Sequence, residues 1–390
     1  MTSRLIKLAT VSAMALASFT FTQSTHAQAT PESRPARQGR GPQGPRIVSP
    51  EVSGDRKLTF RFTDAKADAV RVTSPDVPDL GKGDMTKAEN GTWELTVGPV
   101  PAGAYRYAFS VDGVSIVDPR NYAISESNDH VSSLAVVRGS DVMDETDVPH
   151  GAVAAVAYHS KSLDRDRRMH VYTPPGYENG TEKYPVFYLL HGAGDCDEAW
   201  TSVGRANFIL DNLIAQKKAV PMIVVMPAGH TTHGAGFGGG RGGRDEFGDD
   251  FNGDIKPYVE SHYRTINDRE HRAIAGLSMG GGQTLAIAFS HLADYSYVGV
   301  FSSGAGIGGG GGGSWEDVHK ADLDNAELKP GLKLLWLSTG NKDGLLPRTK
   351  ATVEMLKKHG FDPVFKESER GHVWLNWRDY LVEFTPRLFK

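Results

Sequence analysis

The stretch that most constrains the fold runs from Ala275 to Gly281 and contains the pattern G-x-S-x-G around Ser278. An apolar run, residues 272–275, precedes it, and a helix-like run, residues 282–290, follows it. A strand, a tight turn and a helix in this order lift a serine hydroxyl to the edge of a sheet, and glycines on both sides relieve the crowding of such a turn. The stretch therefore predicts an activated serine, provided that an acid and a histidine follow at the ends of later strands.

The second half of the chain alternates buried strands with helices. Val186 to Leu190 and Met222 to Met226 are continuous apolar runs, which is typical of strands buried on both faces. Further strands are expected at 153–158, 168–172, 297–302, 333–338 and 363–366, and helices at 207–216, 254–263, 282–290, 349–359 and 377–384. This alternation predicts an α/β fold with a mostly parallel sheet covered on both faces.

An acid and a histidine do follow the serine. Asp343 comes after the strand 333–338, and His372 comes after the strand 363–366. The order Ser278, Asp343, His372 is that of an α/β-hydrolase, in which the imidazole takes the serine proton and the carboxylate orients the imidazole. Asp362 or Glu367 stays an alternative acid, and His372 can also be interpreted as a surface-loop residue.

Two backbone N–H groups are needed to bind the oxyanion of an ester intermediate. Met279, next to the serine, supplies one. The loop that follows residues 186–190 reads His191-Gly192-Ala193-Gly194-Asp195, and we expect Ala193 to supply the other, with Gly192 as the next choice. His191 is interpreted as a scaffold residue.

The first third of the chain follows a different pattern. Residues 1–29 are interpreted as a secretory signal, residues 30–46 as a disordered leader and residues 138–151 as a linker to a domain at 152–390. Short alternating strands separated by turns predict a small immunoglobulin-like β-sandwich at 47–137. Its aromatic residues Trp93, Tyr105 and Tyr107 either stack on a sugar or fill the sandwich core, and alternation favours the core.

Composition excludes some function classes. The formal net charge of the 390 residues is −4, so nothing indicates a nucleic acid or an anionic membrane as partner. Cys196 is the one cysteine, so no intrachain disulfide forms. His230, His233, Asp245, Asp249 and Asp250 are close in sequence but do not have zinc-site spacing. We expect no metal and no cofactor.

Residues 149–390 resemble carbohydrate esterase family one. The resemblance lies in Tyr184 to Gly192, Ala199-Trp200, Pro221 to Pro227, Ala273 to Gly281 and Gly371 to Trp374. That family contains feruloyl and acetylxylan esterases and shares its fold with enterochelin esterases and mycolyltransferases. The resemblance implies a serine esterase that acts on an ester-substituted polysaccharide.

The stretch from Asn90 to Tyr107, with Val111-Asp112-Gly113 and Asp118-Pro119, resembles carbohydrate-binding family forty-eight. Such a module in front of the esterase is typical of bacterial enzymes of this kind. Two glycine-rich loops, 231–248 and 308–313, depart from the esterase pattern and are expected to shape the acyl and sugar pockets.

We therefore predict a secreted or periplasmic serine esterase that removes feruloyl or acetyl groups from plant cell-wall xylan, with Trp374, Trp200 and Asp195 as substrate-binding residues. An acetylxylan esterase, a siderophore esterase of the enterochelin type and a non-catalytic carbohydrate-binding protein are the alternatives. Trp374 is interpreted equally well as a pocket wall or as a core residue beside Trp377. The oligomeric state is left open.

Overall fold

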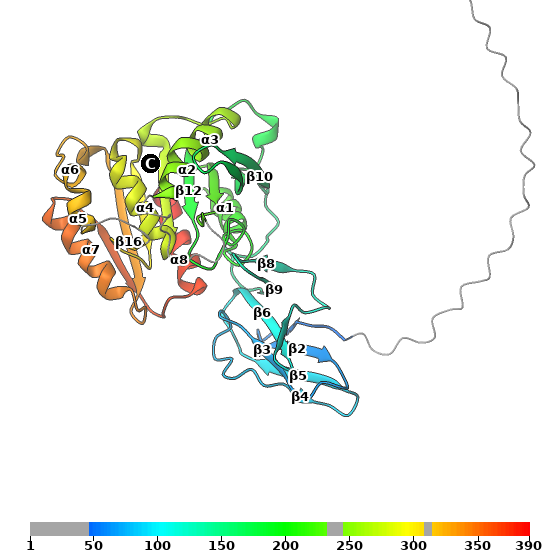
Figure 1. The fold of residues 1–390 in the computed structure, drawn as a ribbon. Coiled ribbons are helices and arrows are strands. Elements are labelled where there is room, and N and C mark those ends of the chain that lie inside the picture. Colours follow the sequence, from blue (N-terminus) through cyan, green and yellow to red (C-terminus); the bar gives the residue numbers. More distant parts are fainter. Residues whose placement is uncertain (1–46, 232–244, 308–313) are drawn as a thin grey trace, which may run out of the picture. The chain divides into compact units, whose positions relative to one another are not determined.

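Eight strands form the largest sheet in the part of the chain that the computed structural model describes, residues 47–231, 245–307 and 314–390 (Figure 1). Their order is β10-β11-β13-β12-β14-β15-β16-β17. β10 and β11 are a hairpin, and β11 also pairs antiparallel with β13, whereas the other neighbours are parallel. The predicted mostly parallel sheet is confirmed.

The elements of this half alternate along the chain. Its strands are β10 (Ala152–Ser160), β11 (Arg165–Thr173), β12 (Val186–Leu190), β13 (Ile223–Pro227), β14 (Arg272–Leu277), β15 (Tyr297–Phe301), β16 (Leu334–Gly340) and β17 (Val364–Ser368). Its helices are α1 (Ala206–Ala215), α2 (Glu246–Asp250), α3 (Lys256–His262), α4 (Met279–Ser290), α5 (Trp315–Val318), α6 (Lys320–Leu323), α7 (Leu346–Lys358) and α8 (Trp374–Phe384).

Helices cover both faces of the sheet, as predicted. The side chains of α1 and α8 share one apolar cluster with one face, and those of α2, α3, α4 and α7 share a second cluster with the other. Every residue of β12, β13, β14 and β15 is buried. Because burying a large apolar side chain contributes about 1.5–3 kcal/mol, these central strands fix the position of the loops at their carboxyl ends.

Three helices begin three residues earlier than the sequence pattern predicts. α4 starts at Met279 rather than 282, α7 at Leu346 rather than 349 and α8 at Trp374 rather than 377. The first turn of α4 contains three glycines, which are poor helix formers, so the early start comes from packing against the sheet and not from local propensity. The predicted helix 254–263 is the last part of a longer helical stretch that begins at Glu246 and contains a π-helical segment at Phe251–Ile255.

Two antiparallel sheets occupy residues 51–137. One has the order β1-β2-β5-β4 and the other β3-β6-β9-β8, with β7 beside β6. Their bounds are β1 (Glu51–Val52), β2 (Leu58–Thr63), β3 (Val70–Thr73), β4 (Thr86–Lys87), β5 (Thr92–Val97), β6 (Gly103–Val111), β7 (Val114–Ile116), β8 (Ile124–Glu126) and β9 (Val131–Val137).

The aromatic residues of these two sheets face inward. Trp93, Tyr105 and Tyr107 are 6%, 0% and 1% exposed and belong to one apolar cluster. The Trp93 indole N–H donates to the Asp64 carbonyl, and the two phenols donate to Pro101 and Asp118. The core interpretation therefore holds for all three side chains, and none of them offers a face to a sugar.

The N-terminal sheets and the large sheet belong to one compact unit, residues 47–390. Ala104 and Leu134 lie in the same apolar cluster as α1 and α8. Arg378 of α8 is fully buried, and its Nη1 donates to the Ala104 carbonyl at 3.0 Å and to the Val203 carbonyl at 2.8 Å. Residues 47–137 are thus tied to the rest of the chain through buried contacts.

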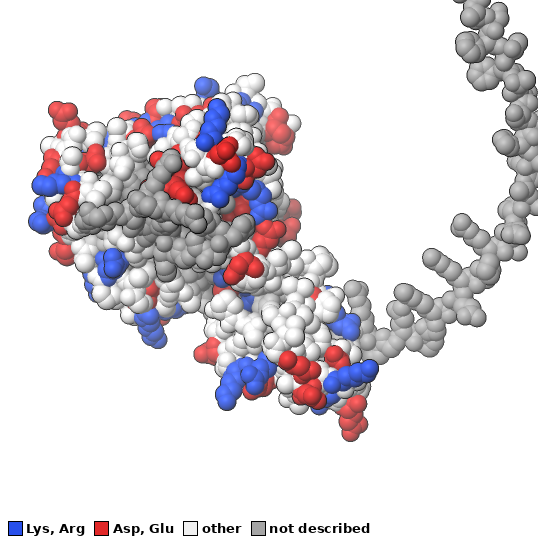
Figure 2. Space-filling view, in the orientation of Figure 1, with Lys and Arg blue, Asp and Glu red and all other residues white. Residues whose placement is uncertain are grey.

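The face shown in Figure 2 carries Lys and Arg interspersed with Asp and Glu, with no field of one sign on that face. This mixture agrees with the small net charge. Among the described residues, no helix has the length and apolar character that crossing a membrane requires. The expected signal and leader, residues 1–46, lie outside the described part.

Candidate active site

Ser278 stands in the sharp turn between β14 and α4, with φ 51° and ψ −115°. Residues other than glycine rarely adopt this backbone conformation, and such strain persists where the surrounding structure enforces it. A β-carbon on Gly276 would lie 2.4 Å from the backbone of Gly280, and one on Gly280 would lie 2.5 Å from the His191 carbonyl. The two glycines of the G-x-S-x-G pattern are therefore required by close backbone packing around the serine.

The structure brings Ser278, His372 and Asp343 together. His372 Nε2 lies 3.0 Å from Ser278 Oγ, and His372 Nδ1 lies 2.9 Å from Asp343 Oδ2. The other carboxylate oxygen of Asp343 accepts the Leu345 N–H at 2.8 Å. Burial alone would raise the pKa of Asp343, but the bonds from His372 and Leu345 outweigh it and lower that pKa. The carboxylate is therefore ionised at neutral pH and holds the imidazole proton on Nδ1.

Two residues that support this arrangement were not found by sequence reasoning. Ser302 follows β15 with φ 49°, and its side chain also lowers the pKa of the Asp343 carboxyl. The indole N–H of Trp377 donates to Ser302 Oγ at 3.0 Å, and the indole packs against His372. The signal that could have found Ser302 is its position, since it follows the strand that lies between the serine strand and the acid strand.

The oxyanion loop, residues 192–197, lies opposite the serine. The Gly229 N–H donates to His191 Nε2 at 2.8 Å, so Nδ1 carries the proton and donates to the Gly192 carbonyl, also at 2.8 Å. The Asp195 N–H donates to the same carbonyl at 3.2 Å. Burial lowers the pKa of His191, which keeps the ring neutral. His191 is thus placed as a scaffold, in agreement with the sequence interpretation.

This bonding orients the peptide between Gly192 and Ala193. Because C=O and N–H of a trans peptide point in opposite directions, a Gly192 carbonyl held toward His191 turns the Ala193 N–H away from it. No described residue accepts from the Ala193 N–H. Met279 is the first residue of α4, so its N–H has no partner within the helix. These are the two donors that the sequence predicts for an oxyanion.

A cavity of about 260 Å³ opens in front of Ser278 and His372. One side of it is apolar, formed by Leu277, Val373, Trp374 and Trp377. The structure thus places two predicted substrate-binding residues, Trp374 and Asp195, at this cavity, although Trp374 is only 1% exposed.

Trp200 corrects the sequence prediction. Its indole is 1% exposed, donates to the Leu190 carbonyl at 3.1 Å and packs edge-on against Trp374 at 5.1 Å. It does not line the cavity, because it sits in the apolar layer behind Trp374. Its assignment to substrate binding is wrong, and its role is to support the wall.

The other side of the cavity is polar and comes from the N-terminal sheets. Asp76, Arg106, Ser127 and His130 line it together with Asp195 of the oxyanion loop. Local sequence patterns gave no sign of the first four of these residues, because they reach the site through packing between segments far apart in the chain.

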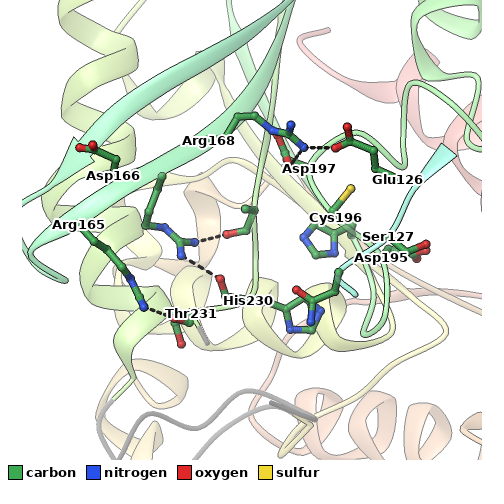
Figure 3. Close-up of a pocket in the computed structure, with 14 residues that line it drawn as sticks. Glu126, Ser127, Arg165, Asp166, Arg168, Asp195, Cys196, Asp197, His230 and Thr231 are labelled. Carbon is green, nitrogen blue, oxygen red and sulfur yellow. Dashed lines mark hydrogen bonds and ion pairs between the residues drawn. The ribbon is translucent and has the colours of Figure 1, made fainter. Parts of the chain in front are cut away.

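A second cavity, of about 380 Å³, adjoins the first and shares Ser127 and Asp195 with it (Figure 3). Arg168 of β11 lines it and pairs with Glu126 at 2.5 Å and with Asp197 at 2.7 Å. His170 also bonds Asp197, at 2.8 Å. These ion pairs fasten the far end of the oxyanion loop to β11.

The residues considered as metal ligands have other partners where the structure describes them. Asp250 pairs with Arg167 at 2.8 Å, and Asp245 caps α2 by accepting from the Gly248 N–H. Glu126, Cys196 and Glu198 lie close enough together to hold an ion, and burial raises the pKa of the Cys196 thiol to about 12, so without a metal the thiol is protonated at neutral pH. His233 and most of the two glycine-rich loops lie outside the described residues.

Comparisons with known proteins place this geometry in a family. The esterase family described as "Putative esterase" matches residues 160–388. An endo-1,4-beta-xylanase/feruloyl esterase of Xylanibacter ruminicola is 31% identical over 350 residues, which cover 87% of this chain and 46% of the relative. The chain thus spans about half the length of that curated relative.

Solved structures show the same fold. A CE1 ferulic acid esterase of Anaeromyces mucronatus is 25% identical with a TM-score of 0.55 and covers 65% of this chain and 96% of its own. The enterobactin esterase of Shigella flexneri, at 18% identity, shares the fold with a TM-score of 0.62 over 85% of this chain and 92% of its own. Because the family match takes in β14, β16 and β17 with the serine, acid and histidine that follow them, the chain belongs to this esterase family.

Proposed function

We propose that this chain is a serine esterase that hydrolyses feruloyl or acetyl esters of plant cell-wall xylan through an acyl-enzyme. The observation that carries the proposal is the hydrogen-bonded chain from Ser278 Oγ through His372 to Asp343, which opens on a cavity that Ala193 also lines. A hydroxyl, an imidazole and a buried carboxylate in this geometry can do acyl transfer without a cofactor.

Acylation follows from the contacts. Ser278 Oγ attacks the ester carbonyl carbon while its proton moves to His372 Nε2, and Asp343 stabilises the imidazolium through Nδ1. The carbonyl oxygen becomes an oxyanion and is bound by the N–H groups of Ala193 and Met279. The C–O bond to the alcohol then breaks, and the alcohol oxygen takes the proton from Nε2. Ser278 is left as an ester of the acyl group.

Deacylation repeats these steps with water. His372 Nε2 takes a proton from water, whose oxygen attacks the acyl carbon and forms a second oxyanion on the same two donors. The bond to Ser278 Oγ breaks, and the serine recovers its proton from Nε2. The free acid leaves, and the balance is one ester and one water consumed for one acid and one alcohol.

The feruloyl choice rests on relatives and on the cavity. The relative from Xylanibacter ruminicola is named for both xylanase and feruloyl esterase activity, and the structure from Anaeromyces mucronatus is named a ferulic acid esterase. The apolar wall of Leu277, Val373 and Trp377 suits a planar aromatic acyl group. Acetyl esters and siderophore esters of the enterochelin type are the alternatives.

We propose that residues 47–137 are an immunoglobulin-like module related to carbohydrate-binding family forty-eight, with a structural role in this chain. The burial of Trp93, Tyr105 and Tyr107 supports the structural role. We also propose that residues 1–29 direct export, so that the enzyme meets its polysaccharide outside the cytoplasm.

The test is Ser278→Ala, assayed on methyl ferulate, 4-nitrophenyl acetate and a siderophore ester. A loss of about 10³-fold or more on the preferred ester is expected, and the order of the three rates in the wild type identifies the acyl group. Ser290→Ala is the matched control: Ser290 is exposed at the end of α4, the helix that follows Ser278, and its replacement should keep full activity. Undiminished turnover by Ser278→Ala would end the proposal.

The rival function, carbohydrate binding without catalysis, makes the opposite prediction. A binding protein would be retained by insoluble xylan equally well with and without the Ser278 hydroxyl, and it would release no ferulate from the xylan. The intact hydrogen-bonded chain argues against this rival, because binding alone requires no serine held in a strained backbone conformation.

A further inference from the structure

The oxyanion loop is clamped from two directions. From the side of the large sheet, Arg168 and His170 of β11 hold Asp197. From the N-terminal sheets, Nη1 of Arg106 donates to Asp195 Oδ1 at 2.6 Å, and the Asn128 N–H donates to the Gly194 carbonyl at 3.0 Å. The contact between Arg106 and Asp195 joins residues that are 89 positions apart in the sequence.

The guanidinium of Arg106 is itself fixed. Its Nε and Nη2 bond the two oxygens of Asp76 at 2.7 and 3.1 Å, a bidentate arrangement that sets the plane of the group. The side chains of Arg106, Asp76 and Asp195 are 11%, 6% and 7% exposed, so water screens these charges little. Arg106 thus reaches Asp195 from a rigid base.

The charges of this cluster favour a lasting contact. Burial alone would lower the pKa of Arg106, but the carboxylates of Asp76 and Asp195 outweigh it and raise that pKa, so the guanidinium stays charged. Burial raises the pKa of Asp195 to about 6, which still leaves the carboxylate ionised at neutral pH. Removing the guanidinium would leave two buried carboxylates without their common partner.

The contact lies close to the reacting atoms. The Asp195 N–H and His191 together hold the Gly192 carbonyl, and that carbonyl sets the direction of the Ala193 N–H. The Arg106 guanidinium also lies 6.0 Å from the centre of the Trp374 ring, two residues after His372. One side chain of the N-terminal sheets therefore touches both the oxyanion loop and the helix that begins after the histidine.

We propose that Arg106 is a positioning residue for ester hydrolysis: by holding Asp195, it fixes the loop that presents the Ala193 N–H to the oxyanion. The inference rests on the proposed esterase function and adds that the N-terminal sheets are part of the catalytic apparatus. Arg106 acts through Asp195 and not on the substrate.

The experiment measures kcat and KM on methyl ferulate, which carries no sugar, for Arg106→Met, Asp195→Asn and the double variant. Each single change should lower kcat by about 10- to 100-fold and change KM by less than about 3-fold, because misplacing an oxyanion donor affects the transition state and not substrate binding. The double variant should be no slower than the slower single variant, because the two residues act as one unit.

Two further variants test specificity. Arg106→Lys should recover part of the kcat that Arg106→Met loses, since the lysine ammonium can pair with one carboxylate but cannot bond both Asp76 and Asp195 as the planar guanidinium does. Arg61→Met removes an arginine of β2 that pairs with Glu51 and Glu94 in the same N-terminal sheets, and it should keep wild-type kcat.

A folded Arg106→Met protein with wild-type kcat would overturn the inference, as would a loss confined to KM or losses that multiply in the double variant. If Arg106→Met does not fold, Asp195→Asn decides alone, because the amide keeps the shape of the carboxylate. Ser278→Ala distinguishes a failure of the esterase proposal from a failure of the positioning role. Activity that survives Ser278→Ala refutes the esterase proposal. If Ser278→Ala is inactive but the Arg106 and Asp195 variants keep wild-type kcat, only the positioning role is refuted.

Discussion

The indole of Trp377 stands edge-on to the imidazole of His372, with 4.9 Å between the ring centroids and 85° between the ring planes. The same indole donates its N–H to Ser302, whose side chain lowers the pKa of the Asp343 carboxyl. One side chain of α8 therefore braces both partners of the serine.

Replacing Trp377 should slow the chemistry on feruloyl and acetyl esters alike, in addition to any loss of contact with an aromatic acyl group. Trp377→Phe keeps a ring against His372 but loses the donor to Ser302, so kcat should fall a few-fold. Trp377→Leu loses both contacts and should lower kcat by about 10-fold or more, since a misplaced base is costly in the transition state. The measurement is kcat on methyl ferulate and on 4-nitrophenyl acetate. An effect limited to KM for one of these esters would contradict the bracing role.

Trp374→Ala should act mainly on stability. The side chain is 1% exposed and lies between Trp200 and Trp377, at 5.1 and 5.2 Å, so its removal leaves a cavity in the core. The expected cost is about 3–5 kcal/mol in the free energy of unfolding, with both esters affected alike. Urea unfolding and parallel assays check this. A selective loss on feruloyl esters with unchanged stability would instead make Trp374 a substrate contact.

Replacing a glycine of the oxyanion loop by alanine should lower kcat at Gly192 but not at Gly194. A β-carbon on Gly192 would lie 2.5 Å from Leu277 Cδ1, a fully buried side chain, so Gly192→Ala should push the loop away and lower kcat by about 10-fold or more. Gly194 has φ +83° but open space around a β-carbon, so Gly194→Ala should cost about 1 kcal/mol of stability through backbone strain alone. Equal kcat values for the two variants would speak against a steric limit at Gly192.

The Asp197 carboxylate should make the free energy of unfolding decrease as the pH falls through the acid range. Burial would raise its pKa, but hydrogen bonds from His170 and Arg168 outweigh burial and lower the pKa to about 2. Because the folded pKa is below the unfolded value of 3.8, the group stabilises the fold above that value, and this contribution is lost as pH falls toward 2. Asp197→Asn should therefore cost about 2 kcal/mol at neutral pH.

Thermal unfolding of the wild type and of Asp197→Asn, followed from neutral pH down to about pH 3, checks the sign. The difference between the two proteins should shrink as the solution becomes more acidic. A difference that stays constant over this range would mean that the asparagine disturbs packing rather than removing a charge.

The sequence predicts Ser278, Asp343 and His372 because each follows a strand of a parallel sheet, and the carboxyl ends of such strands share one edge. β14, β15, β16 and β17 are neighbours in that order, which brings the three residues together. The same rule reaches Ser302 at the end of β15, but Ser302 lies in a run of serine and glycine that reads as an ordinary turn.

The polar wall of the cavity could not be predicted in this way. Arg106 sits within the regular strand β6, and nothing in its neighbours in sequence shows that its charged side chain is buried. Its role depends on how β6 packs against a loop 89 residues away, which is a property of tertiary structure and not of local periodicity. Trp200 was misplaced for the same reason, since an aromatic residue near a site in sequence can lie in the layer behind it.

The buried contact between Arg378 and the Ala104 carbonyl has a consequence for biosynthesis. The two residues are 274 positions apart, so β6 leaves the ribosome long before α8 is made. The N-terminal sheets can form early, since domains generally fold as units during translation, but the surface around Ala104 stays without its cover until the last helix arrives. Burial of this surface therefore waits for the carboxyl-terminal helix, and a chain that ends before residue 378 lacks the bond that covers the Ala104 carbonyl.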